Sequence, residues 1–242
     1  MKQKIIFFLI TIILFGCKKA NERTCLKGNG EYSSIEIEYD NSINEIDLFD
    51  DVNLILINDS LNFISINGPI NLLDFIDLKT ESNKISIKNL NKCDFLRAEK
   101  EIDIYIHYTS LNRINLSGYG NLSNYDTLKH NIIINANNAY SNINLTIDTD
   151  SVQVYLLKGS TSLSLSGFCN YLYGYNSGIA PFNSALLTSK QVHVNSNSIA
   201  RTDIRAIENL NAEIRSYGNI YYTGSPTTTT FSITGEGEII QL

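Results

Sequence analysis

Hydrophobic and polar residues alternate in a series of short runs along the first half of the chain. Each run is four to six residues long, rich in β-branched side chains and bounded by Asn, Asp, Gly or Ser, a pattern typical of β-strands. The clearest runs cover residues 35–39, 52–57, 63–67, 84–88 and 102–107. No helical periodicity of any length appears, and a short helix is expected only near residues 94–100. The pattern therefore predicts an all-β chain.

A second regularity begins at about residue 111, where a turn of small residues followed by a short apolar strand recurs. Such units begin at residues 117, 138, 158, 215 and 234, and the interval between 158 and 215 holds weaker copies near Asn176 and Asn195. A period of about 20 residues is typical of solenoids, in which small residues at a fixed phase let coils turn sharply and stack closely. We therefore predict a single-stranded parallel β-helix with about 20 residues per coil. The alternative is an antiparallel sandwich or barrel, which needs no fixed period.

The N-terminal segment carries an export signal. Lys2 and Lys4 precede an apolar run over residues 5–15, which is too short to span a bilayer and is typical of a secretory leader. The following Gly16-Cys17 resembles the lipobox of bacterial lipoproteins, in which the cysteine is lipidated and several acyl chains give stable anchoring. The alternative is an ordinary signal peptide with a chance cysteine. The sequence thus predicts a lipoprotein signal peptide (1–16), a lipid-anchored tether (17–29) and a β-helix domain (30–242), exported to the cell envelope and held at the outer membrane.

The sequence of residues 30–242 also resembles a known family. The stretches 67–73 and 84–87, the repeated Ser-Gly-Xaa-Gly-Xaa-Ile units and the C-terminal stretch 217–226 are similar to the putative auto-transporter adhesin family with a head GIN domain. This resemblance implies a right-handed parallel β-helix at the cell envelope, in secreted or lipid-anchored proteins without established catalytic residues. The chain departs from the family pattern around residues 168–188, where we expect a bulge or loop to interrupt the helix.

Composition narrows the functional classes. The chain is 43% hydrophobic and 18% charged with a formal net charge of −6, which excludes disorder and, without Lys/Arg blocks, disfavours nucleic-acid binding. Its 35 Ile fit a continuous aliphatic core, and its 30 Asn suit turns and hydrogen-bonded ladders between coils. Cys25, Cys93 and Cys169 match no zinc or redox motif. They are interpreted as buried small hydrophobes, although one disulfide among them stays open.

The sequence offers little catalytic chemistry. His107, His130 and His193 lie far apart, and no nucleophile elbow or phosphate-binding loop is present, so we predict no cofactor, no metal and no enzyme activity. Asp148 and Asp150 would point the same way from a strand. They could hold Ca²⁺ or act as an acid/base pair on a polysaccharide, but two solvated acids at a coil corner are the favoured interpretation.

Tyrosine is the most informative residue type. Tyr119, Tyr140 and Tyr217 occupy the same phase of their repeats, so stacked coils about 4.8 Å apart would align them along one edge. Further tyrosines occur on alternate positions of one run and as a neighbouring pair: Tyr171, Tyr173, Tyr175, Tyr221 and Tyr222. Such rings could stack on sugars or on a partner protein, or could simply stabilise the solenoid.

These observations favour a non-catalytic, lipid-anchored envelope protein whose rigid β-helix serves adhesion by binding glycan or protein. One alternative is a polysaccharide-active enzyme or accessory protein that uses surface carboxylates and tyrosines, and another is a purely structural envelope protein. The oligomeric state stays open, since an uncapped final coil near Ile239 and Ile240 could pair with a second copy.

Overall fold

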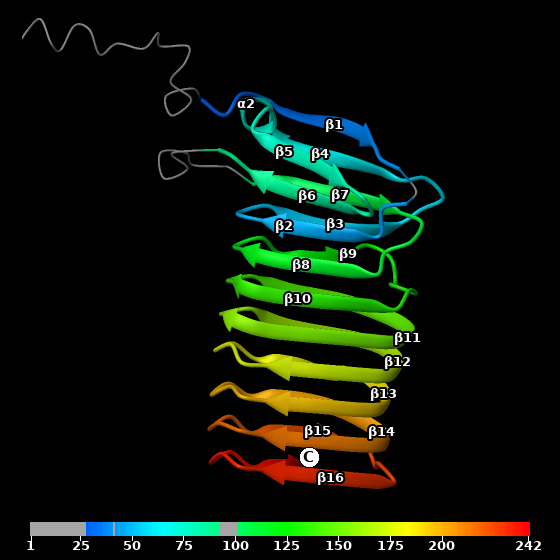
Figure 1. The fold of residues 1–242 in the computed structure, drawn as a ribbon, viewed down its shortest axis with the longest axis vertical. Helices are drawn as coiled ribbons and strands as arrows, with labels where there is room; N and C mark the ends of the chain where they lie inside the picture. The colour runs from blue at the N-terminus through cyan, green and yellow to red at the C-terminus, as the bar shows by residue number, and fades with distance from the viewer. Residues whose placement is uncertain (1–27, 41, 92–100) are drawn as a thin grey trace, which may run out of the picture.

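The computed structural model describes residues 28–40, 42–91 and 101–242, and these residues form strands and a single one-turn helix (Figure 1). The elements are β1 (Tyr32–Glu38), β2 (Glu45–Phe49), β3 (Asn53–Asn58), β4 (Phe63–Pro69), α2 (Ile70–Leu73), β5 (Ile76–Glu81), β6 (Lys84–Asn89), β7 (Asp103–Tyr108), β8 (Arg113–Gly118), β9 (Leu122–Asn124), β10 (Ile132–Ala139), β11 (Asn142–Gly159), β12 (Ser162–Asn176), β13 (Phe182–Ser196), β14 (Thr202–Ile214), β15 (Ile220–Thr223), β16 (Thr228–Ile233) and β17 (Ile239–Gln241). The all-β prediction is confirmed.

The strands stack as coils of a parallel solenoid. Val152 of β11 pairs with Leu172 of β12, which pairs with Val192 of β13, so parallel partners lie 20 residues apart in sequence. Each coil contributes one segment to each of two facing walls. The first wall contains β6, β2, β8, β10, the C-terminal halves of β11–β14, and β16. The second contains β7, β3, β9, the N-terminal halves of β11–β14, β15 and β17. The predicted β-helix is confirmed, and its right-handed sense stays a prediction.

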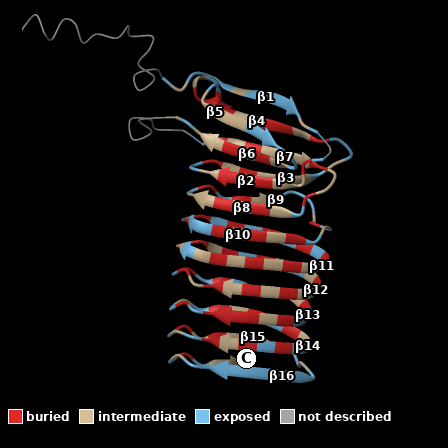
Figure 2. Cartoon of the chain, viewed as in Figure 1, coloured by how far each residue is buried: buried red, intermediate tan, exposed pale blue. Residues whose placement is uncertain are grey.

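The core is a continuous column between the walls. Buried and more exposed residues alternate along the strands (Figure 2), because successive side chains of a strand point to opposite faces. Aliphatic residues of successive coils, such as Ile134, Val154 and Ile214, are almost fully buried. At Gly174 the first wall lacks a side chain, and the fully buried ring of Phe182 from the second wall fills that space. Each coil thus depends on its neighbours for burial.

Asparagine and glycine serve the roles expected from the composition. On the second wall Asn121 Nδ2 donates to Asn53 Oδ1 at 3.0 Å, and Asn142 Nδ2 donates to Asn121 Oδ1 at 3.1 Å, which forms a ladder between coils. Gly159 has a φ of 104°, and a Cβ there would lie 2.1 Å from Ala139 O. The turn can stack on the preceding coil only because residue 159 has no side chain.

The N-terminal coils do not stack in chain order. The coil of β2 and β3 lies between the coil of β6 and β7 and that of β8 and β9, so that Ile46 pairs with Ile85 on one side and Ile114 on the other. Beyond β7, strands β4 and β1 pair antiparallel, and β5 pairs antiparallel with β6. This antiparallel cap covers the N-terminal end of the solenoid (Figure 1). At the other end the inward-facing Phe231 and Ile233 of β16 are exposed, and pairing there with a second copy stays a prediction.

The weak repeat between residues 168 and 188 corresponds to a β-bulge. The register of β12 with β13 shifts between Ser164 and Ser166, and that of β13 with β14 shifts between Ser184 and Ser189. The extra residues of β13 project Leu186 into solvent, while the stack continues on both sides. The predicted interruption is therefore a local bulge, not a break in the solenoid.

Several sequence-based predictions lie outside the described residues. They are the signal peptide (1–16), lipidation of Cys17, the tether up to residue 27, the helix near residues 94–100, and the state of Cys25 and Cys93. In the described residues, no helix has the length and apolar character needed to cross a bilayer. Cys169 is described, and its burial as a small hydrophobe is confirmed. Its Sγ donates to Ser189 Oγ at 3.3 Å, and burial raises the pKa of the Cys169 thiol.

Candidate functional site

The turns that lead from the first wall to the second form one edge of the solenoid, here called the turn edge. Tyr119 and Tyr140 stack there with ring centroids 5.4 Å apart and planes 22° apart. Backbone hydrogen bonds hold this alignment, because Tyr140 N donates to Gly118 O at 2.7 Å and Tyr119 N donates to Asp50 O at 3.3 Å. The two rings are 63% and 51% exposed, so the stack projects into solvent.

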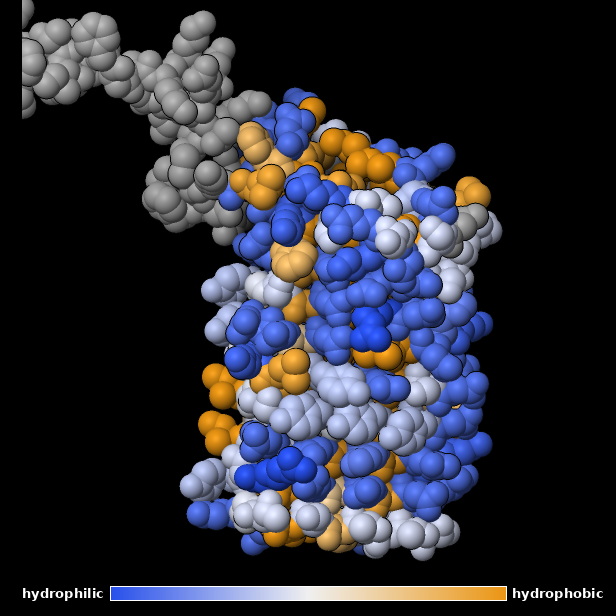
Figure 3. All heavy atoms as spheres, in the orientation of Figure 1, coloured by the Kyte–Doolittle hydropathy of each residue, from blue (hydrophilic) through white to orange (hydrophobic). Residues whose placement is uncertain are grey.

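Tyr217 lies on the same edge but does not continue this stack. Ser160 N donates to Ala139 O at 2.9 Å and Ile179 N donates to Gly159 O at 3.2 Å. Ser160 and Ile179 therefore follow Tyr140 in the next two turns, and Ile199 lies in the turn after them. Ile179, Ile199 and Tyr217 are 64–65% exposed. Figure 3 shows hydrophobic side chains protruding from this edge, at the left of the view. The turn edge thus presents both aromatic and aliphatic side chains. The sequence analysis did not identify its isoleucines, because no Tyr-Gly pair marks their turns.

The second tyrosine cluster lies on the outer surface of the first wall. Tyr171, Tyr173 and Tyr175 are half-buried and alternate with buried residues of β12, which places their rings on one face. Tyr173 contacts Tyr155 on one side and His193 on the other, with ring centroids 5.2 Å apart in both cases. We call these five residues the aromatic face. Sequence inspection missed Tyr155, although its pairing with Tyr175 follows from the repeat.

Burial favours the neutral form of two phenols of the aromatic face. Desolvation raises the pKa of Tyr171 and Tyr173, and the neighbouring Tyr155 raises both further. Tyr171 and Tyr173 therefore present ring surfaces and neutral hydroxyl groups, not phenolate charge, over the physiological pH range.

A shallow hollow of about 330 Å³ lies beside the aromatic face, toward the C-terminal end of the first wall. It is lined by Tyr171, Gln191, Val192, His193, Asn209, Leu210, Asn211, Thr228 and Thr230. It forms because the outward residues of β14 and β16 are Asn and Thr, which are shorter than the aromatic residues of the preceding coils. Rings bound the hollow on one side, and amides and hydroxyls form its floor.

The predicted pair Tyr221 and Tyr222 does not form a surface cluster. The two residues are adjacent in β15, so their side chains point to opposite faces. Tyr222 is 8% exposed and its hydroxyl donates to Gln241 Oε1 at 3.2 Å, which makes it a core residue. Tyr222 therefore does not join Tyr221 in a further exposed tyrosine cluster.

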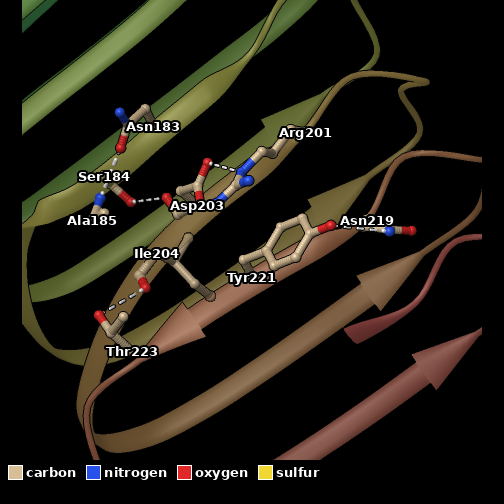
Figure 4. A network of polar contacts seen from close by, with 9 residues as sticks. All are labelled: Asn183, Ser184, Ala185, Arg201, Asp203, Ile204, Asn219, Tyr221 and Thr223. Carbon is tan, nitrogen blue, oxygen red and sulfur yellow. Dashed lines mark hydrogen bonds and ion pairs between the residues drawn. The ribbon is translucent and has the colours of Figure 1, made fainter. Parts of the chain in front are cut away.

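Tyr221 belongs to a polar network on the second wall (Figure 4). Arg201 donates to both carboxylate oxygens of Asp203 at 2.6 and 2.7 Å, and its guanidinium lies 4.0 Å from the centroid of the Tyr221 ring. Asn219 Nδ2 donates to the Tyr221 hydroxyl at 3.3 Å. Asp203 raises the pKa of Arg201. These groups satisfy one another and stabilise the stacking of β14 on β15.

Asp148 and Asp150 point to the same side, as predicted from their spacing. Asp150 Oδ1 accepts a hydrogen bond from Asn170 Nδ2 at 2.6 Å. Within the described ranges no three His, Cys, Asp or Glu residues gather closely enough to hold a metal ion. Two exposed carboxylates at a coil corner, one of them bonded to the next coil, fit a structural role.

The three histidines are distributed over separate contacts. His107 Nδ1 lies 2.9 Å from Asp59 Oδ2, and the His107 ring stacks on Phe63 with centroids 3.8 Å apart. His130 contacts the edge of Tyr108, and His193 contacts Tyr173. Each ring is thus engaged by a different neighbour, and the structure brings no two histidines together.

The fold and surfaces define this chain as a parallel β-solenoid that presents exposed aromatic residues on one edge and one wall. The chain belongs to the family described as putative auto-transporter adhesin, head GIN domain, whose model matches residues 42–226. The sequence-based recognition of this family is therefore confirmed. None of the curated proteins matches this sequence.

Solved structures share the fold. A putative adhesin from Bacteroides fragilis matches with a TM-score of 0.76 at 20% identity, over 88% of this chain and 97% of that one. A putative lipid binding protein from Parabacteroides distasonis matches with a TM-score of 0.61 at 17% identity, over 89% and 98% of the two chains. A putative adhesin from the same species matches with a TM-score of 0.60 at 16% identity, over 89% and 98%. At these identities the likeness concerns the fold alone.

Proposed function

We propose that this protein is a non-catalytic adhesin, anchored in the cell envelope by a lipid on Cys17, which binds a glycan or protein partner through its exposed aromatic surfaces. The observation that carries the proposal is the turn edge, where Tyr119, Tyr140, Ile179, Ile199 and Tyr217 are each at least half exposed. Exposed apolar residues in a row are uncommon on soluble proteins and mark interaction surfaces.

The solenoid suits such a surface because it holds the side chains at fixed spacing. Hydrogen bonds between successive turns set the positions of the turn-edge residues, so little conformational entropy is lost when a partner binds. The family membership supports an adhesive role as well. The described residues give less support to catalysis, because Asp150 is hydrogen-bonded to Asn170 and the two aspartates belong to no group of three His, Cys, Asp or Glu residues that could hold a metal ion.

A lipid on Cys17 would place the capped N-terminal end of the solenoid toward the membrane. The segment from Cys17 to Gly28 spans at most about 40 Å when fully extended. The turn edge and the C-terminal coils would then lie farthest from the bilayer, where a partner can reach them.

The proposal is tested on intact cells that express the full chain. Externally added protease should degrade the wild-type protein, and Cys17→Ser should release it from the membrane fraction, because the acyl chains provide the anchor. Adhesion of these cells to immobilised mucin should fall several-fold in the Tyr119→Ala/Tyr140→Ala variant. Asn144→Ala, on the second wall, serves as the control. Protection of the protein from protease together with unchanged adhesion would refute the proposal.

A further inference from the structure

We infer that the hollow on the first wall is a binding site for an uncharged sugar unit of a glycan, with Tyr171 and His193 against the ring and with Gln191, Asn209 and Asn211 on its hydroxyls. This inference deepens the proposed function, since it rests on a glycan being the partner and assigns the first wall as the place where a sugar unit of that glycan binds.

The hollow follows two neighbouring columns of outward residues. One column runs through Tyr171, Gln191, Asn209 and Thr228, and the second runs through His193, Asn211 and Thr230. Coils are about 4.8 Å apart, so the longer column covers roughly 14 Å along the solenoid axis. This length accommodates a disaccharide segment lying parallel to the axis.

The chemistry of the lining matches a sugar. The apolar C–H face of a pyranose packs on aromatic rings, and Tyr171 and His193 offer such rings at one side of the hollow. Amide and hydroxyl groups both donate and accept hydrogen bonds, as sugar hydroxyls do. The floor consists of three amides and two threonine hydroxyls, a dense set for a hollow of about 330 Å³.

The amides of the hollow are free to bind, unlike those elsewhere on the same wall. Asn135 Nδ2 donates to Asn115 Oδ1 at 2.7 Å, and Asn115 Nδ2 donates to Asp47 Oδ1 at 2.6 Å. The amides of these N-terminal coils are therefore occupied by hydrogen bonds between coils. In the described part of the chain, the side chains of Gln191, Asn209 and Asn211 form no such bond. Asn211 pairs in register with His193 and Thr230, and Asn209 pairs with Gln191 and Thr228, so the column of hydrogen-bonded asparagines does not continue through the hollow.

The lack of charged side chains in the described lining of the hollow favours an uncharged ligand. Among the residues that the structure describes, no Asp, Glu, Lys or Arg lines the hollow. Glu213, which lies two positions beyond Asn211 on the same face of β14, is paired with Arg215 Nε at 2.7 Å and Asn195 Nδ2 at 2.6 Å. An acidic glycan would therefore gain no ion pair in the hollow and would lose hydration on entering it.

The test uses the full chain carrying Cys17→Ser, in affinity electrophoresis through gels that contain single polysaccharides. The neutral probes are mannan, galactan, xylan, laminarin and dextran, and the acidic probes are polygalacturonate and hyaluronate. We expect at least one neutral polysaccharide to retard the protein. In that gel Asn209→Ala/Asn211→Ala and Tyr171→Ala should each weaken binding by about tenfold or more, the ratio expected from losing one or two ordinary contacts.

Two controls match these variants. Asn144→Ala removes an exposed amide from the second wall, and Tyr125→Ala removes an exposed ring that belongs to neither the turn edge nor the aromatic face; neither should change retardation. Thermal unfolding followed by circular dichroism verifies that every variant is folded. Retardation by acidic probes alone, or by no probe, would overturn the inference while leaving cell adhesion as an independent test of the proposed function. Loss of binding in Tyr119→Ala but not in the hollow variants would move the glycan to the turn edge and would also overturn it.

Discussion

The contact between Gly174 and Phe182 offers a direct test of how the coils pack. Gly174 belongs to the first wall and Phe182 to the second, and the two meet across the core only if the coils stack in the observed register. A Cβ added at Gly174 would lie 2.6 Å from Phe182 Cζ and 3.0 Å from Cε2. Such overpacking costs about 1–3 kcal/mol of unfolding free energy, so Gly174→Ala should destabilise the wild-type chain.

The sign of this effect should reverse once the ring is removed. Phe182 is fully buried, and Phe182→Ala should cost about 3–5 kcal/mol because it leaves a cavity. In that background the methyl of Gly174→Ala fills part of the cavity, and a buried methylene contributes about 0.8 kcal/mol. Replacing Gly by Ala also restricts the unfolded chain, which adds about 0.4–1 kcal/mol. Gly174→Ala should therefore stabilise the Phe182→Ala variant by about 1 kcal/mol.

The measurement is a double-mutant cycle by urea titration followed by far-ultraviolet circular dichroism. Ser164→Ala, an outward-facing change in β12, serves as the control and should have little effect. The reasoning is refuted if Gly174→Ala has the same effect in both backgrounds to within about 0.5 kcal/mol, because separate sites behave additively. Facing antiparallel sheets in another register would give that additive result.

Two further predictions concern a turn and a charged pair. Gly167 has a φ of 104°, and a Cβ there would lie 2.1 Å from Ile147 O. In urea titration, Gly167→Ala should therefore lower the free energy of unfolding by at least about 1–3 kcal/mol. The control is Gly28→Ala, which has open space around it and should change the free energy of unfolding by less than about 0.5 kcal/mol. The hydrogen bond from His107, followed by that from the Ser60 backbone, lowers the pKa of Asp59. A lowered folded-state pKa gives stability that is present above the unfolded pKa of about 3.9 and is lost as pH falls through the folded value, so Asp59→Asn should flatten the acid limb of a melting-temperature profile. An unchanged limb would show that the pair contributes nothing.

Local patterns were sufficient to predict the coils after residue 111. Alternation reports which side chains face inward, and the recurrence of small-residue turns reports the length of a coil. Both signals can be read directly from the sequence. The alternation within a single strand was enough to place Tyr171, Tyr173 and Tyr175 on one face. The same reasoning should have separated Tyr221 from Tyr222, because adjacent residues of a strand cannot share a face.

The N-terminal coils required the tertiary structure. Residues 46, 85 and 114 all lie in alternating apolar strands, and any of them could pair with any other by pattern alone. Their order, with β2 between β6 and β8, consists of long-range pairings, in which residue 46 pairs with residues 85 and 114. No local signal encodes that choice, because many aliphatic strands have equivalent inward faces.

The sequence by itself determined that this chain is a β-solenoid with coils of about 20 residues and tyrosines at repeated positions. Only the tertiary structure decided what those positions become. In the structure, Tyr155 and His193 pack against the predicted tyrosines, and Ile179 and Ile199 lie on the turn edge. The short side chains of Asn and Thr lie beside longer aromatic side chains, which leaves a hollow. The physical reason is that periodicity fixes the direction of a side chain, whereas the surface around it depends on the residues one and two coils away, and these lie about 20 or 40 positions apart in the sequence.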